Sequence, residues 1–314
     1  MGEEFMLQTF LLDIIEDRNE FFLSDQNLAY YTNGDVLYSI LKYKELWLRS
    51  TVCMNDYKEI RYASEYVIKL LLDNDRRMLE SIVNILQSIT KIPEEYLRNG
   101  LVNMLKDISG GLYLHTYIMC LTEHDEKEFP NGNLQMFNSY GRGNGICIVF
   151  DRDKLKPFDL PIYKIHYLTE DKIKKKVNEL LERLEDKYVE LRHVSNNSIL
   201  EYLKLFFIHL IVTTKDPGFK QEKEWRLVIN REIINYNDIF TNNLREEVEC
   251  INGIPQIIQK LNLDGNENVL RKIILEPRYE MSAEVLAINQ FLRNNWHFED
   301  TEGIIRVSDI PIRR

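Results

Sequence analysis

Helical and strand-like segments follow one another in blocks along this chain, and that order is the strongest constraint on its fold. Residues 4–22 carry apolar side chains at helical spacing, and a mostly helical region runs from about 57 to 107. Short β-rich runs follow at 112–122, 145–151 and 163–168. Because strands and helices do not alternate strictly, we expect an α+β fold with a central, mostly antiparallel sheet.

The second half of the chain keeps this block order. Residues 169–216 read as helix, first highly charged and then apolar. Strand-like runs resume at 224–229, 271–277 and 303–308, with a helix near 282–294. We therefore expect an N-terminal helix within residues 1–27 and a single α+β domain over 28–314, with helical insertions at about 57–107 and 169–216.

Composition places the chain among soluble globular proteins. Of its 314 residues, 44% are hydrophobic and 29% are charged, and the formal net charge is −10. That excess of carboxylates repels phosphate at long range, which disfavours a general nucleic-acid-coating role but leaves room for a local basic groove. The longest apolar window, 199–212, is too short to cross a bilayer and is interrupted by charges, so no membrane association is expected.

The cysteines and the N-terminus indicate a cytoplasmic protein. Cys53, Cys120, Cys147 and Cys250 form no CxxC pair, which fits buried thiols in a reducing compartment. The opening residues are acidic where a signal peptide needs basic ones.

The stretch QEKEWRLVIN, residues 221–230, raises the sharpest functional question. On a strand, Glu222 and Glu224 would share one face while Trp225 and the apolar residues after it alternate onto the other. Two like charges beside a core are unfavourable unless cations, solvent or a catalytic role compensate. They are therefore either solvated acids paired with neighbouring cations, or a catalytic pair.

Two further segments are candidate ligand sites. The turn within LAYYTNGDVLYSIL, residues 28–41, either is an ordinary capped strand-to-helix turn or presents backbone N–H groups to an anion. Three glycines between 141 and 145 adjoin Tyr140 and Arg142, and they form either a flexible hairpin or a ligand loop.

Metal and nucleophile motifs are weak. The six histidines form no HExxH pair, and neither a GxSxG elbow nor a Walker loop occurs, so we expect no metal site. A degenerate acid-and-QxK pattern, Asp216, Gln221 and Lys223, is the basis for a metal-dependent nuclease as a less favoured alternative.

Five elements in order resemble the bacterial family catalogued as domain of unknown function 2971. They are AYYTNGDVLYSILKYKELWLRSTVCMNDYKEI, CLTEHDE, FNSYGRGNGICIVFD, QEKEWRLV and VSDIPIRR, which together span about residues 28–314. Where the family commonly has His in its first strand, this chain has Tyr30.

The layout is also similar, more remotely, to ADP-ribosyltransferases, which implies a split sheet and NAD as a substrate. By this resemblance Glu224 would orient the nicotinamide ribose, and Glu222 would help to activate the acceptor. Tyr30, Tyr31 and Thr32 would contact the ribose or nicotinamide.

The same resemblance implies roles for the glycine loop: Tyr140 would stack on the nicotinamide ring and Arg142 would hold the pyrophosphate. We expect an NAD-dependent ADP-ribosyltransferase or NAD glycohydrolase, a toxin-like or phage-defence effector that modifies a nucleic acid or protein. The alternative is a non-catalytic module that senses a ligand or binds a partner, such as an antitoxin, in a defence or toxin–antitoxin system.

Overall fold

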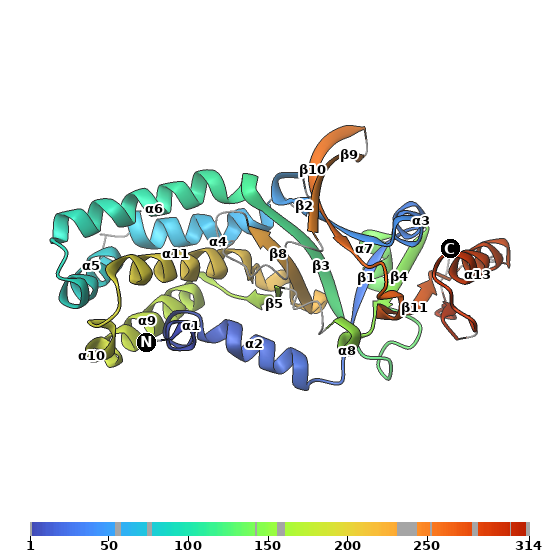
Figure 1. The fold of residues 1–314 in the computed structure, drawn as a ribbon, viewed down its shortest axis with the longest axis horizontal. Coiled ribbons are helices and arrows are strands. Elements are labelled where there is room, and N and C mark those ends of the chain that lie inside the picture. Colours follow the sequence, from blue (N-terminus) through green and yellow to red (C-terminus); the bar gives the residue numbers. More distant parts are fainter. Residues whose placement is uncertain are drawn as a thin grey trace.

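The computed structural model describes residues 2–53, 58–73, 77–141, 143–155, 161–230, 244–251, 253–277, 282–301 and 303–311. Within these residues an open sheet of ten strands forms the framework (Figure 1). Eight follow one path, in the order β12, β11, β4, β1, β3, β2, β10 and β9, while β8 pairs with β3 and β5 pairs with β8.

The strands of this sheet are β1 (Asn27–Asn33), β2 (Glu45–Ser50), β3 (Thr116–His124), β4 (Gly145–Phe150), β5 (Ile162–Lys164), β8 (Glu224–Asn230), β9 (Leu244–Ile251), β10 (Ile254–Asn262), β11 (Leu270–Leu275) and β12 (Ile305–Val307). Their pairings are antiparallel except for β11 with β12. A separate two-stranded sheet joins β6 (His166–Tyr167) to β7 (Thr214–Lys215) in parallel. The expected mixed fold with a mostly antiparallel sheet is confirmed.

The sheet divides along β3. One edge of this strand pairs with β8 from Thr116 to Thr122. On its other edge, β1 meets only the end of β3 and β2 meets only its beginning, at Tyr117 and Ile118. Residues 119–121 pair with neither strand, so β1 and β2 separate from each other there.

Most helices pack into one body beside β5 and β8 (Figure 1). They are α1 (Glu3–Phe10), α2 (Leu12–Leu23), α4 (Lys58–Ile68), α5 (Arg77–Thr90), α6 (Glu94–His115), α9 (Glu170–Asp186), α10 (Tyr188–Leu191) and α11 (Asn196–Val212). The two segments expected as helical insertions thus supply helices that bury apolar side chains against one another and against Val228 of β8.

A second core lies on the other face of β8. Trp225, Leu227 and Ile229 point into it, which confirms the predicted alternation along this strand. Helices α3 (Gly34–Tyr43) and α13 (Ser282–Asn295) also contribute to this core. The start of α3 is capped as expected, because the Asn33 side chain accepts a hydrogen bond from the N–H of Val36.

Two local expectations were wrong, and one pair of strands was missed. The single helix over 4–22 is two helices that break at Leu11, which lets Phe10 enter the helical core and Phe21 the second core. The strand expected from 112 begins at Thr116, because α6 continues to His115; an apolar run alone does not separate a strand from a helix end. The hairpin of β9 and β10 was not predicted.

Candidate functional site

Glu222 and Glu224, together called the acidic step, lie where a turn enters β8. Glu224 is the first residue of the strand, but Glu222 ends a 3₁₀ turn over Pro217–Glu222. The Asp216 carboxylate caps that turn by accepting from the N–H of Gly218 at 2.8 Å, and Lys223 takes a left-handed conformation with φ of 44°. The prediction that both acids share a strand face was therefore wrong, because the strand does not extend back to Glu222.

Lys215 nevertheless brings the two acids together. Its Nζ donates to Glu222 Oε2 at 2.6 Å and to Glu224 Oε2 at 2.9 Å. The side chain of Lys215 is 1% exposed, that of Glu224 is 4% and that of Glu222 is 13%. Of the two carboxylates, Glu222 is the one that reaches solvent.

Glu224 has a second cation. Nε of Arg226, which is fully buried, donates to Glu224 Oε1 at 2.6 Å, and an Nη1 hydrogen bond of 2.9 Å ties the same guanidinium to the carbonyl of Val212 at the end of α11. Burial alone would raise the pKa of Glu224, but the charges of Arg226 and Lys215, with hydrogen bonds from Arg226 and Cys120, lower it to about 2. Glu224 is a carboxylate whose charge is fully neutralised inside the protein.

Aromatic side chains border the more exposed acid. Tyr140, at the end of helix α7 (Leu134–Tyr140), donates its hydroxyl to Glu222 Oε1 at 3.1 Å, and 40% of its surface is exposed. Burial of the hydroxyl, and the Glu222 charge beside it, raise the pKa of Tyr140. Phe219, also 40% exposed, has the Nζ of Lys215 4.7 Å from its ring centroid. The acids, the lysine and two partly exposed rings thus form one constellation.

The backbone around this constellation is also held. The Thr122 hydroxyl donates to the carbonyl of Glu222, and the N–H of Glu224 donates to the Tyr167 hydroxyl at 2.9 Å. Strands β3 and β6 therefore fix the turn from both sides.

The candidate residues of β1 lie on opposite faces of the sheet. Tyr31 is buried against Phe137 and accepts, through its hydroxyl, a hydrogen bond of 2.8 Å from the N–H of Asn133, the residue that caps α7. Since α7 ends at Tyr140, Tyr31 is connected to the constellation through that helix. Tyr30 packs against the second core, and its side chain is hydrogen-bonded to that of Thr32. No described hydrogen bond joins Tyr30 or Thr32 to either acid, although Tyr30 lies near Cys120, which is hydrogen-bonded to Glu224.

Of the three glycines after Tyr140, Gly141 and Gly145 are required by close packing. A Cβ added at Gly141 would lie 2.4 Å from the Cα of Gly145 and 2.6 Å from the carbonyl oxygen of Phe137. The Glu276 carboxylate accepts from the N–H of Gly145 at 2.6 Å. The loop between α7 and β4 is therefore tied down at both ends. Arg142, together with Asn55 and Asp56 of the first family-like element, lies outside the described residues.

Sequence reasoning missed Lys215, Tyr167 and Glu276. For Lys215 the available signal was a single lysine that follows the apolar run of α11 after two threonines, at a position where a buried charge needs partners.

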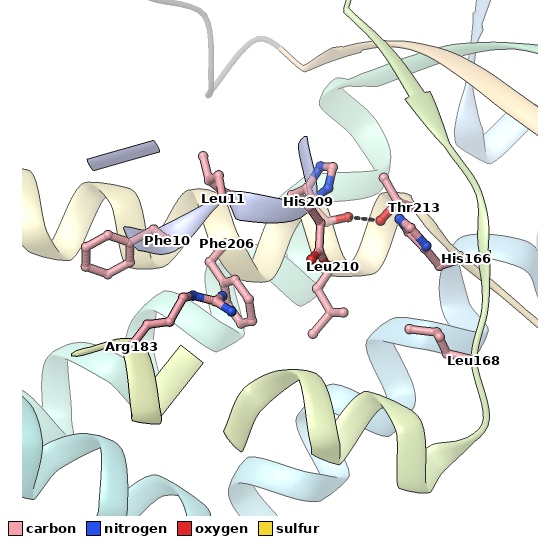
Figure 2. A pocket seen from close by; sticks show the side chains of 10 residues that line it. Phe10, Leu11, His166, Leu168, Arg183, Phe206, His209, Leu210 and Thr213 are labelled. Carbon is pink, nitrogen blue, oxygen red and sulfur yellow. Dashed lines mark hydrogen bonds between the residues drawn. The ribbon is translucent and has the colours of Figure 1, made fainter. Parts of the chain in front are cut away.

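A small cavity lies away from the acids, between the N-terminal helices, α9 and α11 (Figure 2). Its volume is about 10 Å³, enough for one water molecule. His166, whose Nε2 is 3.0 Å from Asp17 Oδ2, and His209, whose Nε2 has no hydrogen-bond partner, both line it.

The described ranges hold no metal-ligand cluster and no helix that could span a membrane. They contain no group of three or more His, Cys, Asp or Glu side chains placed to hold a metal ion. Of the nuclease-like pattern, Asp216 caps the turn and Lys223 pairs with Glu128 at 3.3 Å. Among the helices of the same ranges, none is long and apolar enough to cross a membrane.

Comparison with known proteins gives one family. Residues 136–227 match the model of a family described as protein of unknown function (DUF2971). No curated protein and no solved structure matches the chain significantly. The match supports the family resemblance predicted from the sequence, and its range includes Tyr140, Lys215 and both acids. The remoter likeness to ADP-ribosyltransferases stays a prediction.

Proposed function

We propose that this chain cleaves NAD at the acidic step and transfers ADP-ribose to a macromolecular acceptor, a nucleic acid or a protein, as a toxin-like or phage-defence effector. The observation that carries the proposal is the setting of Glu222. Its carboxylate is anchored by Lys215, touched by the Tyr140 hydroxyl, and bordered by the partly exposed rings of Tyr140 and Phe219.

The chemistry suits NAD because its nicotinamide is a cationic aromatic ring joined to a ribose. When the bond between nicotinamide and ribose C1′ breaks, its electron pair leaves with nicotinamide, and positive charge develops on the ribose. A carboxylate fixed in a partly water-excluded site stabilises that charge. Aromatic faces attract a pyridinium ring in the same way that they attract other cations. The acceptor then attacks C1′ and loses its proton.

Glu222 takes the role beside the ribose in this proposal. The resemblance assigned that role to Glu224, but both oxygens of Glu224 are already paired with Lys215 and Arg226 in the interior. Because the side chain of Glu224 is only 4% exposed, a ribose hydroxyl could reach it only by disturbing this buried ion-pair network. Glu224 instead holds Lys215 in place behind Glu222.

Incubation of the protein with NAD, followed by chromatography of released nicotinamide, tests the proposal. Glu222→Gln keeps the size of the side chain but removes its charge, so release should fall by about 100-fold or more, in the range seen when one transition-state electrostatic contact is lost. Glu128→Gln is the matched control, because Glu128 is an exposed acid near the same turn that pairs with Lys223. Equal turnover by Glu222→Gln and the wild type would remove the mechanism.

A ligand-sensing or partner-binding module without catalysis is the second candidate. The complete pairing of Glu224 with two buried cations favours it, because such a network can serve recognition alone. Calorimetric titration with NAD separates the two: saturable binding that depends on Glu222, with no release of nicotinamide, supports the sensing module over the enzyme.

A further inference from the structure

Lys215 is the residue at this site that no motif assigns. It occupies the two-residue strand β7, between the apolar helix α11 and the 3₁₀ turn that ends at Glu222. Its ammonium group is almost fully buried and forms ion pairs with both Glu222 and Glu224. No other described cation contacts Glu222, whereas Glu224 also has Arg226.

We propose that Lys215 is a positioning residue that fixes the Glu222 carboxylate for its reaction, and that Arg226 keeps Glu224 in place when Lys215 is lost. This inference rests on the proposed function for its catalytic consequence but not for its geometry. The two acids differ in how many described cations they contact, so loss of the Lys215 ammonium group removes the one described cation of Glu222 while Glu224 keeps Arg226.

Lys215 fixes the orientation of the Glu222 carboxylate as well as pairing with its charge. Glu222 Oε2 faces Lys215 and Glu222 Oε1 faces the Tyr140 hydroxyl, so the plane of the carboxylate is defined by these two contacts. The hydrogen bond from Thr122 fixes only the backbone of Glu222. Without the ammonium group, the side chain is free to rotate away from β8 into solvent, because Glu222 is the more exposed acid.

Carbodiimide-driven coupling of an amine to carboxylates, read by peptide mass spectrometry, tests the geometric part on the whole chain. In Lys215→Met we expect Glu222 to couple at least fivefold faster than in the wild type, with the Glu224 rate unchanged. Lys220→Met is the matched control, because Lys220 is an exposed lysine in the same turn. A Glu222 rate in folded Lys215→Met equal to that of the wild type overturns the proposal.

A buried acid left without its lysine can prevent folding, and a second variant covers that outcome. Lys215→Met combined with Glu224→Gln removes one charge of each sign and leaves Glu222 and Arg226 as the remaining pair of opposite charges. Circular dichroism and thermal melting establish which variant is folded. The same acceleration at Glu222 is expected in the double variant, and its absence there also overturns the proposal.

Nicotinamide release tests the catalytic part by a double-mutant cycle. Lys215→Met should lower kcat at least tenfold with KM within about twofold, because the aromatic rings that receive NAD remain. Combined with Glu222→Gln, Lys215→Met should cause no further loss, since it acts through Glu222. Additive losses would mean a general structural role and overturn the positioning role. A wild-type protein that releases no nicotinamide refutes the proposed function alone, and the coupling experiment still decides the role of Lys215.

Discussion

His209 should make the folded protein sensitive to mild acid. It lies on α11 with 8% of its surface exposed, and its ring packs edge-on against Tyr163 with centroids 5.0 Å apart. Burial, with smaller contributions from the neighbouring His166 and Lys176, lowers the pKa of His209 to about 3 against the opposing charge of Asp13. The imidazole is therefore neutral in the folded state at any pH above that value.

The sign and size of the effect follow from this lowered pKa. The ordinary histidine pKa of 6.5 applies to the unfolded chain, which therefore takes up the proton first as the pH falls. Folding stability is complete above that value and is lost progressively down to the folded pKa. At about 1.4 kcal/mol per pKa unit, the loss amounts to about 2 kcal/mol at pH 5 and at most about 5 kcal/mol below pH 3.

Urea unfolding followed by tryptophan fluorescence at pH 8, 7, 6 and 5 measures this loss. His209→Phe keeps a ring against Tyr163 but cannot titrate, so its decline in unfolding free energy between pH 8 and pH 5 should be smaller than that of the wild type by about 2 kcal/mol. His124, another buried histidine with a pKa lowered to about 4 chiefly by burial, adds a decline that both proteins share.

The exposed His193 provides the matched control, and His193→Gln should keep the wild-type pH dependence. Glu224 does not interfere in this range, because a carboxylate with a depressed pKa loses its contribution only below its ordinary value of 4.5. If His209→Phe declines as steeply as the wild type, the buried neutral imidazole is not the acid-sensitive group.

Two substitutions test the segment that carries Tyr140, both by urea unfolding at pH 8. Gly141→Ala should lower the unfolding free energy by about 1–3 kcal/mol, because the added Cβ would meet the backbone of Gly145. Gly100→Ala is the control: this glycine lies in open space within α6, so its replacement should raise the unfolding free energy by up to about 1 kcal/mol. The reverse order of the two stabilities would refute the close packing of the loop. Tyr31→Phe should cost about 1–3 kcal/mol because the N–H of Asn133 loses its acceptor, and an unchanged midpoint would show that the hydrogen bond contributes nothing to stability.

The strands that could be predicted are those whose local pattern agrees with their final place. β1, β2 and β4 bury apolar side chains from continuous or alternating runs, and the residues before or after them are turn formers. The β9–β10 hairpin shows why others could not. Its first strand carries Glu247 and Glu249, a residue type depleted in strands, and each of these pairs across the hairpin with Lys260 at 2.5 Å. Such a cross-strand contact is set by register, which local propensity does not contain.

In the candidate site, too, residues in a local motif could be predicted and long-range contacts could not. The acids and Tyr140 could be singled out because each stands in a short motif, and the structure joins Glu222 to Tyr140 although 82 positions separate them. Lys215 could be noted only as a lysine after an apolar run, and its contact with Glu222 could not be predicted because that contact depends on the 3₁₀ turn that reverses the chain between them. The two acids do lie close together, but the predicted reason was wrong: both side chains bind Lys215, and they do not share one face of a strand.

Stability alone gives little reason for four charges at the start of β8. Lys215, Arg226 and Glu224 lose nearly all contact with water, and their mutual attraction largely offsets that desolvation without exceeding it by much. Apolar side chains of similar volume would hold the strand as well, as Trp225 and Leu227 do on its opposite face. What apolar residues cannot provide is a carboxylate with a fixed direction at the surface. Because the four charges balance and Glu222 is the acid that reaches solvent, the network converts two acids into one oriented group, which is the property that a site for a developing positive charge requires.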